Sequence, residues 1–342
     1  MTTEGVVRAE SQAAPARMSL VPAVRVSDLT LRYGSTLALD DVSLKVERGS
    51  SFALLGPNGA GKTSLMSVLA TLLPASAGTA EVAGFDVARN PRQVRQSIGM
   101  VFQDASLDDR LSAEENLDFH GLVYGMPKRA RAAAIDRVLA LVELTDWRDK
   151  IVRTFSGGMK RRLEIARAQM HDPEILFLDE PTVGLDAQTR AKIWGYLDSQ
   201  RRERGLTILT TTHYIEEVEG ADQVCIIDKG RIIAEGTPDD LKRRHGRAFI
   251  HARAATQDDA DALAAAYPDA TRGKADDFAI AVLDDSVVPD FLRRFGNRIK
   301  EMRYERPTLE GVFLELTGRV LRDRSDNGRE AARAEGRRAG RR

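Results

Sequence analysis

The feature that most constrains this chain is a glycine-rich loop between an apolar run and a helical pattern. Residues 51–55 form a short, almost wholly apolar run, and residues 64–72 have the apolar spacing of a helix. The segment between them matches the pattern G-x-x-x-x-G-K-[ST] with Gly56, Pro57, Asn58, Gly59, Ala60, Gly61, Lys62 and Thr63. A buried strand that feeds a helix through such a loop predicts an α/β protein of the P-loop NTPase class.

The chemistry of this loop predicts a site for nucleotide phosphates. Glycines let the backbone turn so that several N–H groups point into one concavity, and the following helix adds the positive end of its dipole. We expect Lys62 to reach the β- and γ-phosphates, Thr63 to ligate Mg²⁺, and Ser64 with nearby N–H groups to hold the α- and β-phosphates. The alternative, a plain glycine-rich turn, leaves the strand and helix around the loop unexplained.

A second candidate feature is an apolar run that ends in two carboxylates. Residues 175–178 are apolar and are followed by Asp179 and Glu180. A buried strand with this ending places both carboxylates at the carboxyl edge of a parallel sheet, where α/β proteins bind ligands. Asp179 suits the Mg²⁺ shell, and Glu180 suits the general base that deprotonates the attacking water. Without the phosphate loop upstream, a charged strand end facing solvent would be the simpler interpretation.

Two further polar residues are weaker candidates. His213 follows an apolar run and three threonines, and from there it could bond the γ-phosphate and sense its loss. A lone histidine is more often structural, but this one lies just past an expected strand at 207–211. Gln103 could touch Mg²⁺ or the attacking water, although a glutamine by itself carries almost no signal.

The triplet Ser156, Gly157 and Gly158 stands at an expected helix start and forms a second anion site. One nucleotide does not need two such loops from one chain. The natural solution is a head-to-tail homodimer in which this triplet covers the ATP held by the other copy's phosphate loop.

With these motifs in this order, residues 24–242 resemble the ATPase family of ABC transporters. The resemblance implies an α/β core with an antiparallel β subdomain and a helical subdomain, and it implies ATP hydrolysis. It also assigns roles to further residues: Tyr33 as the aromatic that stacks on adenine, Gln103 as the Q-loop residue, Asp186 as the D-loop residue and His213 as the switch histidine.

A narrower resemblance rests on residues 102–108, 116–117 and 307–318. These segments look like the daunorubicin-resistance ATPase subunits, which power two-component drug exporters and carry an extra C-terminal domain that contributes to assembly. The signature departs from the commonest form, with Phe155 where Leu is usual and Met159 where Gln is usual, but its Ser-Gly-Gly core is intact. The segment 307–318 also has the spacing of an amphipathic helix that packs on its own domain.

The resemblance implies that two copies bind ATP and Mg²⁺ at their interface and drive a separate transmembrane permease through the surface around Gln103 and residues 104–116. The expected cargo is a drug, an antibiotic or another hydrophobic compound. Alternative cargoes are a lipid, a polysaccharide or an ion. A soluble ABC ATPase without a transporter is a further alternative, although repair types insert a long coiled coil where only 93 residues (156 − 63) separate Thr63 from Ser156. A regulatory subunit without turnover is disfavoured by the intact Glu180 and His213.

The rest of the chain predicts a division into four parts. Residues 1–22 should be disordered, 23–245 should form the ATPase domain with its helical subdomain at about 104–170, 246–318 should form a small βαββαβ domain, and 319–342 should be an Arg-rich disordered tail. Strands at 24–26, 29–33 and 42–46 are expected in the antiparallel sheet, because they alternate apolar and polar residues.

Composition narrows the partners and the location. Lys+Arg and Asp+Glu both number 51, so the charge is balanced and gives no support to nucleic-acid binding. We find no run of about 18 apolar residues and no secretory signal, so we expect a peripheral protein held at the cytoplasmic face of the membrane by its permease. The one cysteine, Cys225, lies in an apolar run and is expected to be a buried small hydrophobe.

Overall fold

The computed structural model describes residues 21–104, 106–273, 276–282 and 285–318. The two segments for which the sequence predicts disorder, 1–22 and 319–342, lie outside these residues except for positions 21 and 22. No helix within the described ranges combines the length and the apolar character needed to cross a bilayer.

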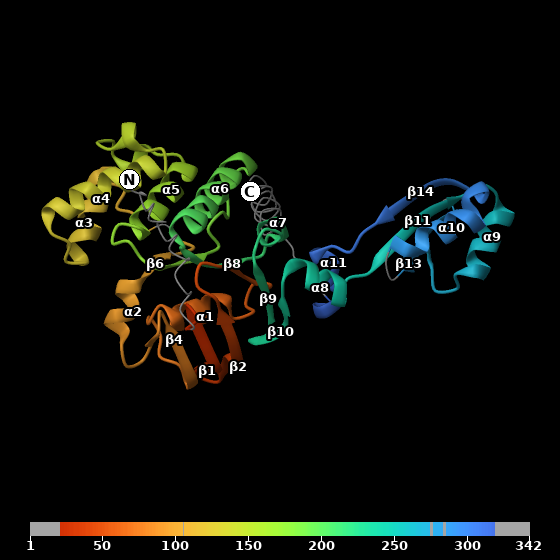
Figure 1. Ribbon diagram of the computed structural model, residues 1–342, viewed down its shortest axis with the longest axis horizontal. Coiled ribbons are helices and arrows are strands. Elements are labelled where there is room, and N and C mark those ends of the chain that lie inside the picture. The colour runs from red at the N-terminus through yellow and green to blue at the C-terminus, as the bar shows by residue number, and fades with distance from the viewer. Residues whose placement is uncertain (1–20, 105, 274–275, 283–284, 319–342) are drawn as a thin grey trace, which may run out of the picture.

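A mainly parallel sheet forms the centre of the larger, N-terminal part of the described chain (Figure 1). Its order is β10-β9-β3-β8-β7-β6, and only β10 runs antiparallel to its neighbour. Every residue of β7 and β8 is buried, as expected for parallel strands covered on both faces. The strands span Ser51–Leu55 (β3), Ile98–Val101 (β6), Ile175–Asp179 (β7), Thr207–Thr212 (β8), Gln223–Asp228 (β9) and Arg231–Gly236 (β10).

An antiparallel sheet of order β2-β1-β4-β5 lies below the central sheet in Figure 1. Two of the strands expected from the sequence, 24–26 and 29–33, form one strand, because the chain passes Asp28 with a φ of 51° and a register shift instead of ending there. The helix α1 (Lys62–Leu69) shares one apolar cluster with both sheets. The strands span Val24–Tyr33 (β1), Thr36–Val46 (β2), Ala77–Val82 (β4) and Phe85–Asp86 (β5).

The segment 104–170, predicted to be a helical subdomain, contains an apolar cluster of its own. A capping box between Ser112 and Glu115 starts its first helix. Tyr196 of the helix α6 (Ala187–Arg204) packs against this cluster, whereas Ile193 and Leu197 of the same helix pack with residues of the central sheet. Helix α2 (Pro91–Ser97) leads into β6, and the subdomain comprises α3 (Ala113–Val123), α4 (Lys128–Leu141), η1 (Thr145–Trp147), η2 (Val152–Thr154) and α5 (Gly157–Ala168).

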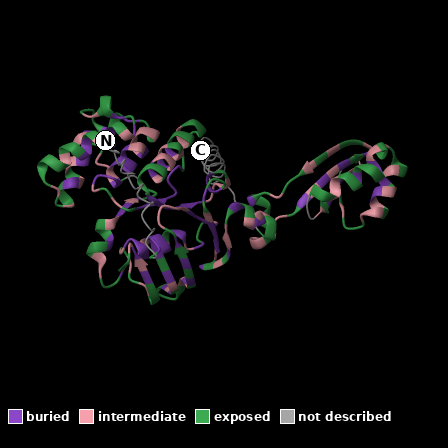
Figure 2. Ribbon diagram, viewed as in Figure 1, coloured by how far each residue is buried: buried purple, intermediate pink, exposed green. Residues whose placement is uncertain are grey.

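The C-terminal part forms a separate lobe with a buried interior of its own (Figure 2). Its elements follow the expected βαββαβ order, and its sheet has the antiparallel order β12-β13-β11-β14. The elements span Ala248–Ala254 (β11), Gln257–Ala266 (α9), Thr271–Arg272 (β12), Asp277–Val282 (β13), Asp285–Val287 (η4), Val288–Phe295 (α10), Gly296–Arg298 (η5) and Ile299–Glu305 (β14).

The last described helix, α11 (Leu309–Thr317), does not pack on this lobe. It returns to α8 (Pro238–His245), and its buried Val312 and Phe313 join an apolar cluster with residues of β3 and β9. The sequence places this helix in the small domain 246–318, but by its packing α11 belongs to the core around the central sheet. The buried apolar side chains of α11 pack in the same cluster as Val218 of the short helix α7 (Ile215–Val218).

This packing predicts that Phe313→Ala destabilises the core around the central sheet and not the small lobe. Phe313 is 1% exposed, and loss of a buried phenylalanine costs about 3–5 kcal/mol. Leu314→Ala is the matched control, because Leu314 is 44% exposed on the same helix. Denaturant unfolding of both variants, with ATP present and absent, measures the difference. Equal unfolding of the two variants would contradict the placement of α11.

Candidate functional site

The phosphate loop joins β3 to α1 in a conformation that requires glycine. Gly61 caps α1 with a φ of 108°, and a Cβ on it would lie 2.7 Å from the carbonyl oxygen of Ala38. No side chain caps the first turn of α1, so its N–H groups are available to an anion. The expected strand–loop–helix context of the motif is present.

Lys62 lies inside this loop with its side chain 5% exposed. Its Nζ donates to the carbonyl oxygens of Gly56, at 2.7 Å, and Pro57, at 3.2 Å, and it lies 3.6 Å from Oε1 of Glu180. Burial lowers the pKa of Lys62, and the charges of Glu180 and Asp179 oppose that shift without cancelling it. The ammonium therefore joins the loop to the carboxylate at the end of β7.

The Glu180 carboxylate contacts the side chains of Lys62, Gln103 and His213. Its Oε2 accepts from Nε2 of Gln103 at 3.1 Å, and its Oε1 lies 3.4 Å from Nδ1 of His213. Burial by itself raises the pKa of Glu180, but the hydrogen bond from His213 and the charge of Lys62 outweigh it, so the pKa lies below its ordinary value. The site thus holds an ionised carboxylate beside a histidine, an amide and an ammonium.

The backbone of Glu180 is itself unusual. Its φ is 46°, in the left-handed region that a non-glycine residue seldom adopts. Its N–H donates to both the carbonyl oxygen and the hydroxyl of Thr211, each at 3.1 Å. This turn sends the Glu180 side chain in a different direction from that of Asp179, whose Oδ1 accepts from the Thr211 hydroxyl.

The residues predicted for Mg²⁺ offer oxygen donors, which Mg²⁺ prefers. Asp179 is 2% exposed at the end of β7, whereas Thr63 is exposed on the first turn of α1. Gln103 bonds Glu180 through its amide nitrogen, a contact that does not use its amide oxygen. This donor set of carboxylate, hydroxyl and amide fits the cation in chemical type.

Tyr33 ends β1 beside the same helix start. Its hydroxyl lies 3.4 Å from Oγ of Ser64, and the residue is 49% exposed. An exposed ring next to the phosphate loop has a free face on which a base can stack. The adenine-stacking role that the resemblance assigns to Tyr33 stays a prediction.

The signature triplet and Asp186 stand at the starts of α5 and α6. Ser156 caps α5, and Gly157 faces open space. A Cβ on Gly158 of α5 would lie 2.8 Å from Cγ2 of Thr189 in α6, so the close packing of these two helices favours a glycine at position 158. Asp186 caps α6 and accepts from the N–H and the hydroxyl of Thr189 at 2.9 and 2.8 Å, and these hydrogen bonds lower its pKa.

Sequence reasoning missed two residues that hold this site together. Thr211 bonds both acidic residues, and Arg161, only 7% exposed, bonds the main chain around Glu180. The available signal for Arg161 was a charged pair with Glu164, three residues on, among the apolar residues of α5. In the sequence alone, such a charged pair is equally typical of a helix face that is exposed to solvent.

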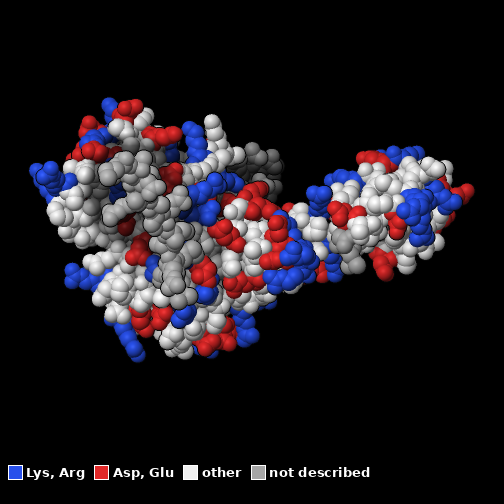
Figure 3. Space-filling view, viewed as in Figure 1, with Lys and Arg blue, Asp and Glu red and all other residues white. Residues whose placement is uncertain are grey.

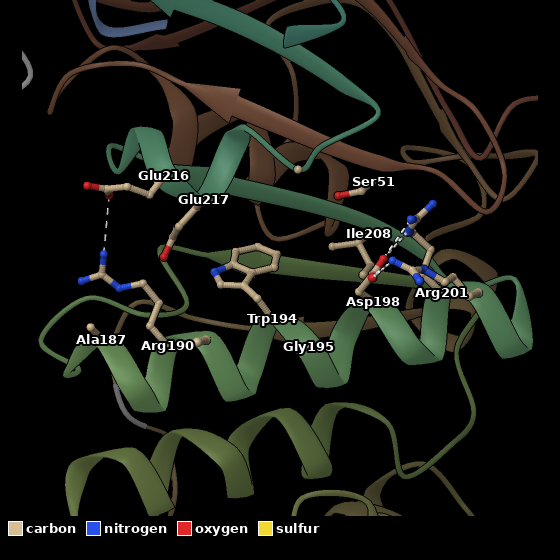
Figure 4. A pocket seen from close by; sticks show the side chains of 13 residues that line it. Ser51, Ala187, Arg190, Trp194, Gly195, Asp198, Arg201, Ile208, Glu216 and Glu217 are labelled. Carbon is tan, nitrogen blue, oxygen red and sulfur yellow. Dashed lines mark hydrogen bonds and ion pairs between the residues drawn. The ribbon is translucent and has the colours of Figure 1, made fainter. Parts of the chain in front are cut away.

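A cavity of about 660 Å³ opens between α6 and α7, away from the phosphate loop (Figure 4). Trp194 stands in its middle, and the Arg190–Glu216 ion pair, at 3.7 Å, closes one end. None of the predicted site residues lines it. The cavity lies between α6, which Asp186 caps, and α7, which follows His213.

The chain is similar to known proteins over most of its length. Residues 39–183 match the family model described as ABC transporter. The chain is 41% identical to the daunorubicin resistance ATP-binding protein DrrA3 of Streptomyces coeruleorubidus, over 86% of this chain and 96% of that protein. It is 39% identical to the doxorubicin resistance ATP-binding protein DrrA of Mycobacterium tuberculosis, over 84% and 91%.

Among solved structures, the chain is similar to the dimeric ATP-binding cassette MJ0796 in a post-hydrolysis state with ADP and phosphate. The TM-score is 0.58 at 26% identity, and the match covers 63% of this chain and 98% of that one.

The lowered pKa of Glu180 predicts how Glu180→Gln affects stability as the pH changes. A carboxyl whose folded-state pKa lies below its unfolded value stabilises the fold above the unfolded pKa and loses that contribution as the pH falls through the folded pKa. The free energy of unfolding of the parent minus that of the variant should therefore shrink on acidification. Urea unfolding, carried as far into the acid range as both proteins stay folded, measures it.

Glu174→Gln is the control for this series, because Glu174 is exposed at the opposite end of β7. Its difference from the parent should stay small at every pH, since exposed ion pairs contribute about 0–1 kcal/mol. A difference for Glu180→Gln that stays constant or grows on acidification would contradict the sign of the shift.

Proposed function

Because the chain belongs to the ABC transporter family of ATP-binding proteins, we propose that it hydrolyses ATP to power an exporter whose membrane path is a separate permease. The observation that carries this proposal is the convergence of Lys62, Gln103 and His213 on the Glu180 carboxylate. Lys62, Gln103 and His213 come from three different segments. Together with Glu180 they offer a phosphate ligand, a polar group for Mg²⁺, a group that can bond the γ-phosphate and a base, which suits phosphoryl transfer to water.

In the proposed mechanism, the glycine-rich loop and Lys62 hold the phosphates, while the ring of Tyr33 carries the adenine. Thr63, Asp179 and Gln103 would hold Mg²⁺, which neutralises charge on the phosphates when bound. Glu180 accepts the proton of the attacking water, and its lowered pKa keeps it ionised at neutral pH. His213 stabilises that carboxylate and faces the same space, where it can bond the γ-phosphate.

We propose that two copies act together. Ser156, Gly157 and Asp186 are exposed, so they are available to a second copy. A head-to-tail pair would set the triplet Ser156, Gly157 and Gly158 of one copy against the γ-phosphate of the ATP bound by the other copy. The similarity to a dimeric cassette supports that arrangement. Loss of the γ-phosphate removes contacts that favour the closed pair, so hydrolysis reopens it.

The permease is proposed to dock on the helical subdomain. Helix α3 exposes Phe119 (63%), Leu122 (53%) and Val123 (68%), and it lies at the outer edge of the molecule (Figure 1). Neighbouring exposed apolar side chains of this size are typical of a protein–protein contact. Docking there would hold the chain at the cytoplasmic face of the membrane, and it favours a transporter subunit over a free-standing ATPase.

For the cargo we propose drugs, antibiotics or related hydrophobic compounds, because the relatives are named for resistance to daunorubicin and doxorubicin. Lipid, polysaccharide and ion remain the alternatives. We propose no nucleic-acid partner, since Lys and Arg are interspersed with Asp and Glu over the visible face (Figure 3). The lobe from β11 to β14 is proposed to serve subunit assembly.

The proposed base predicts that Glu180→Gln binds ATP but hydrolyses it about 10²–10⁴-fold more slowly. The amide keeps the shape of the side chain and cannot accept the proton of water. Phosphate release gives kcat, and size-exclusion chromatography with ATP and Mg²⁺ should show the variant as a dimer. Glu174→Gln, at the exposed end of the same strand, should match the parent. Hydrolysis by Glu180→Gln at the parental rate would exclude Glu180 as the base.

The docking surface predicts that Phe119→Ser, Leu122→Ser and Val123→Ser together release the chain from membranes of its source cells. The change removes apolar contacts at the permease and leaves the site untouched, so ATPase activity of the purified chain should be unchanged. Cell fractionation and immunoblotting measure the membrane-bound share. Leu72→Ser, at a residue 52% exposed on the core, is the control. An unchanged membrane-bound share for the triple variant would place the docking surface elsewhere.

A further inference from the structure

Helix α5 carries a buried arginine that the proposed mechanism does not use. The Arg161 side chain is 9% exposed, and it forms an ion pair with Glu164, 4% exposed, at 2.9 Å. A buried guanidinium is costly unless its donors are satisfied. Arg161 has five N–H donors, and the structure gives it five acceptors.

Four of the five acceptors are main-chain carbonyl oxygens, and they lie on two segments of the candidate site. At the end of β7, Nη2 of Arg161 donates to the carbonyl oxygens of Asp179, at 3.2 Å, and Glu180, at 3.1 Å, while Nε donates to that of Pro181. On the other side, Nη1 donates to the carbonyl oxygen of Phe102 at 2.6 Å. Phe102 immediately precedes Gln103. The Arg161 side chain therefore joins the segment that carries Gln103 to the segment that carries Glu180.

The partner carboxylate extends this connection along the same loop. Glu164 accepts from Nη1 of Arg161 with one oxygen and from the N–H of Ser106, at 2.8 Å, with the other. Arg167 of the same helix donates to the carbonyl oxygen of Ser106. Residues on both sides of Gln103 are therefore attached to α5, the helix that begins at the signature triplet.

The conformation of Glu180 explains what such an attachment would do. Its φ of 46° costs free energy, so the surrounding contacts must hold the backbone there. Thr211 holds the N–H side of this residue, and Arg161 holds its carbonyl side. A lysine has three donors on one atom and cannot span these carbonyls as the planar fork of arginine does.

We propose that Arg161 is a positioning residue that fixes Glu180 and Gln103 relative to the signature helix, so that movement of the helical subdomain is transmitted to the base. This inference rests on the proposed role of Glu180. None of the five acceptors of Arg161 belongs to the phosphate loop. Loss of Arg161 should therefore lower kcat and leave ATP binding intact.

The test uses the full chain with Arg161→Gln, Arg161→Lys and the double variant Arg161→Gln/Glu164→Gln. We expect kcat to fall about 10²-fold in Arg161→Gln, the loss that misplacing a reacting group by about 1 Å can cause, with KM for ATP changed less than about twofold. Arg161→Lys should recover only part of the rate, because it restores the charge but not the four carbonyl contacts.

The double variant separates positioning from simple stability. Arg161→Gln leaves Glu164 buried without its partner and should lower the thermal unfolding midpoint. Removing the Glu164 charge as well should restore much of that midpoint while kcat stays low, because the carbonyl contacts are still missing. A double variant that regains parental kcat together with its stability would reduce Arg161 to a structural role and overturn the inference.

Two comparisons complete the experiment. Arg162→Gln is the matched control, since Arg162 is the next residue of α5 but bonds Val142 and pairs with Glu143 away from the site; its kcat should equal that of the parent. Glu180→Gln is assayed in parallel. If it is inactive while the Arg161 variants keep parental kcat and KM, this inference alone fails. If Glu180→Gln stays active, the proposed base fails and the inference falls with it.

Discussion

The parallel pairing of β3 and β7 with β8 is the constraint on which the site depends. Leu55, the last residue before the phosphate loop, pairs with Thr212, and Asp179 pairs with Thr211. Neighbouring residues of one buried strand thus bring the loop and the two carboxylates to the same edge of the sheet. The 3.6 Å contact between Lys62 and Glu180 follows from this register, since each side chain starts within a few residues of a paired position.

The site is completed from outside the sheet, and this makes it responsive to the rest of the molecule. Gln103 reaches Glu180 from the segment that leads into the helical subdomain, and His213 reaches it from the end of β8. Because separate segments hold the Glu180 carboxylate, a movement of any one of them changes the contacts of this carboxylate. The buried contacts of Arg161 join one of these segments to the helix that starts at the signature triplet.

The C-terminal part combines an independent lobe with a helix that belongs to the core. The lobe has its own apolar cluster, whereas α11 joins the cluster that contains Leu55 and Val224. The chain therefore leaves the ATPase core after α8 and returns to it at α11. The lobe is thereby connected to the core at both of its ends, which suits the assembly role proposed for it.

The sequence by itself determined the α/β class, the order of the motifs and most of the site, because the phosphate loop, the apolar strand ending in Asp179 and Glu180, and the serine-glycine triplet are local patterns with local chemistry. It did not reveal β4 or β6: the first half of β4 is exposed and contains Gly78, and β6 is only four residues long, so neither has a clear periodicity. It also misplaced α11, since an amphipathic pattern states which face is buried but not against what.

Only the tertiary structure decided the role of Thr211 and Arg161, whose hydrogen bonds to Asp179 and Glu180 join residues 18 to 32 positions apart in the chain. A threonine in a strand and an arginine in a helix carry no local signal of such contacts. Their partners are main-chain and carboxylate groups that come together when the sheet and the helical subdomain pack.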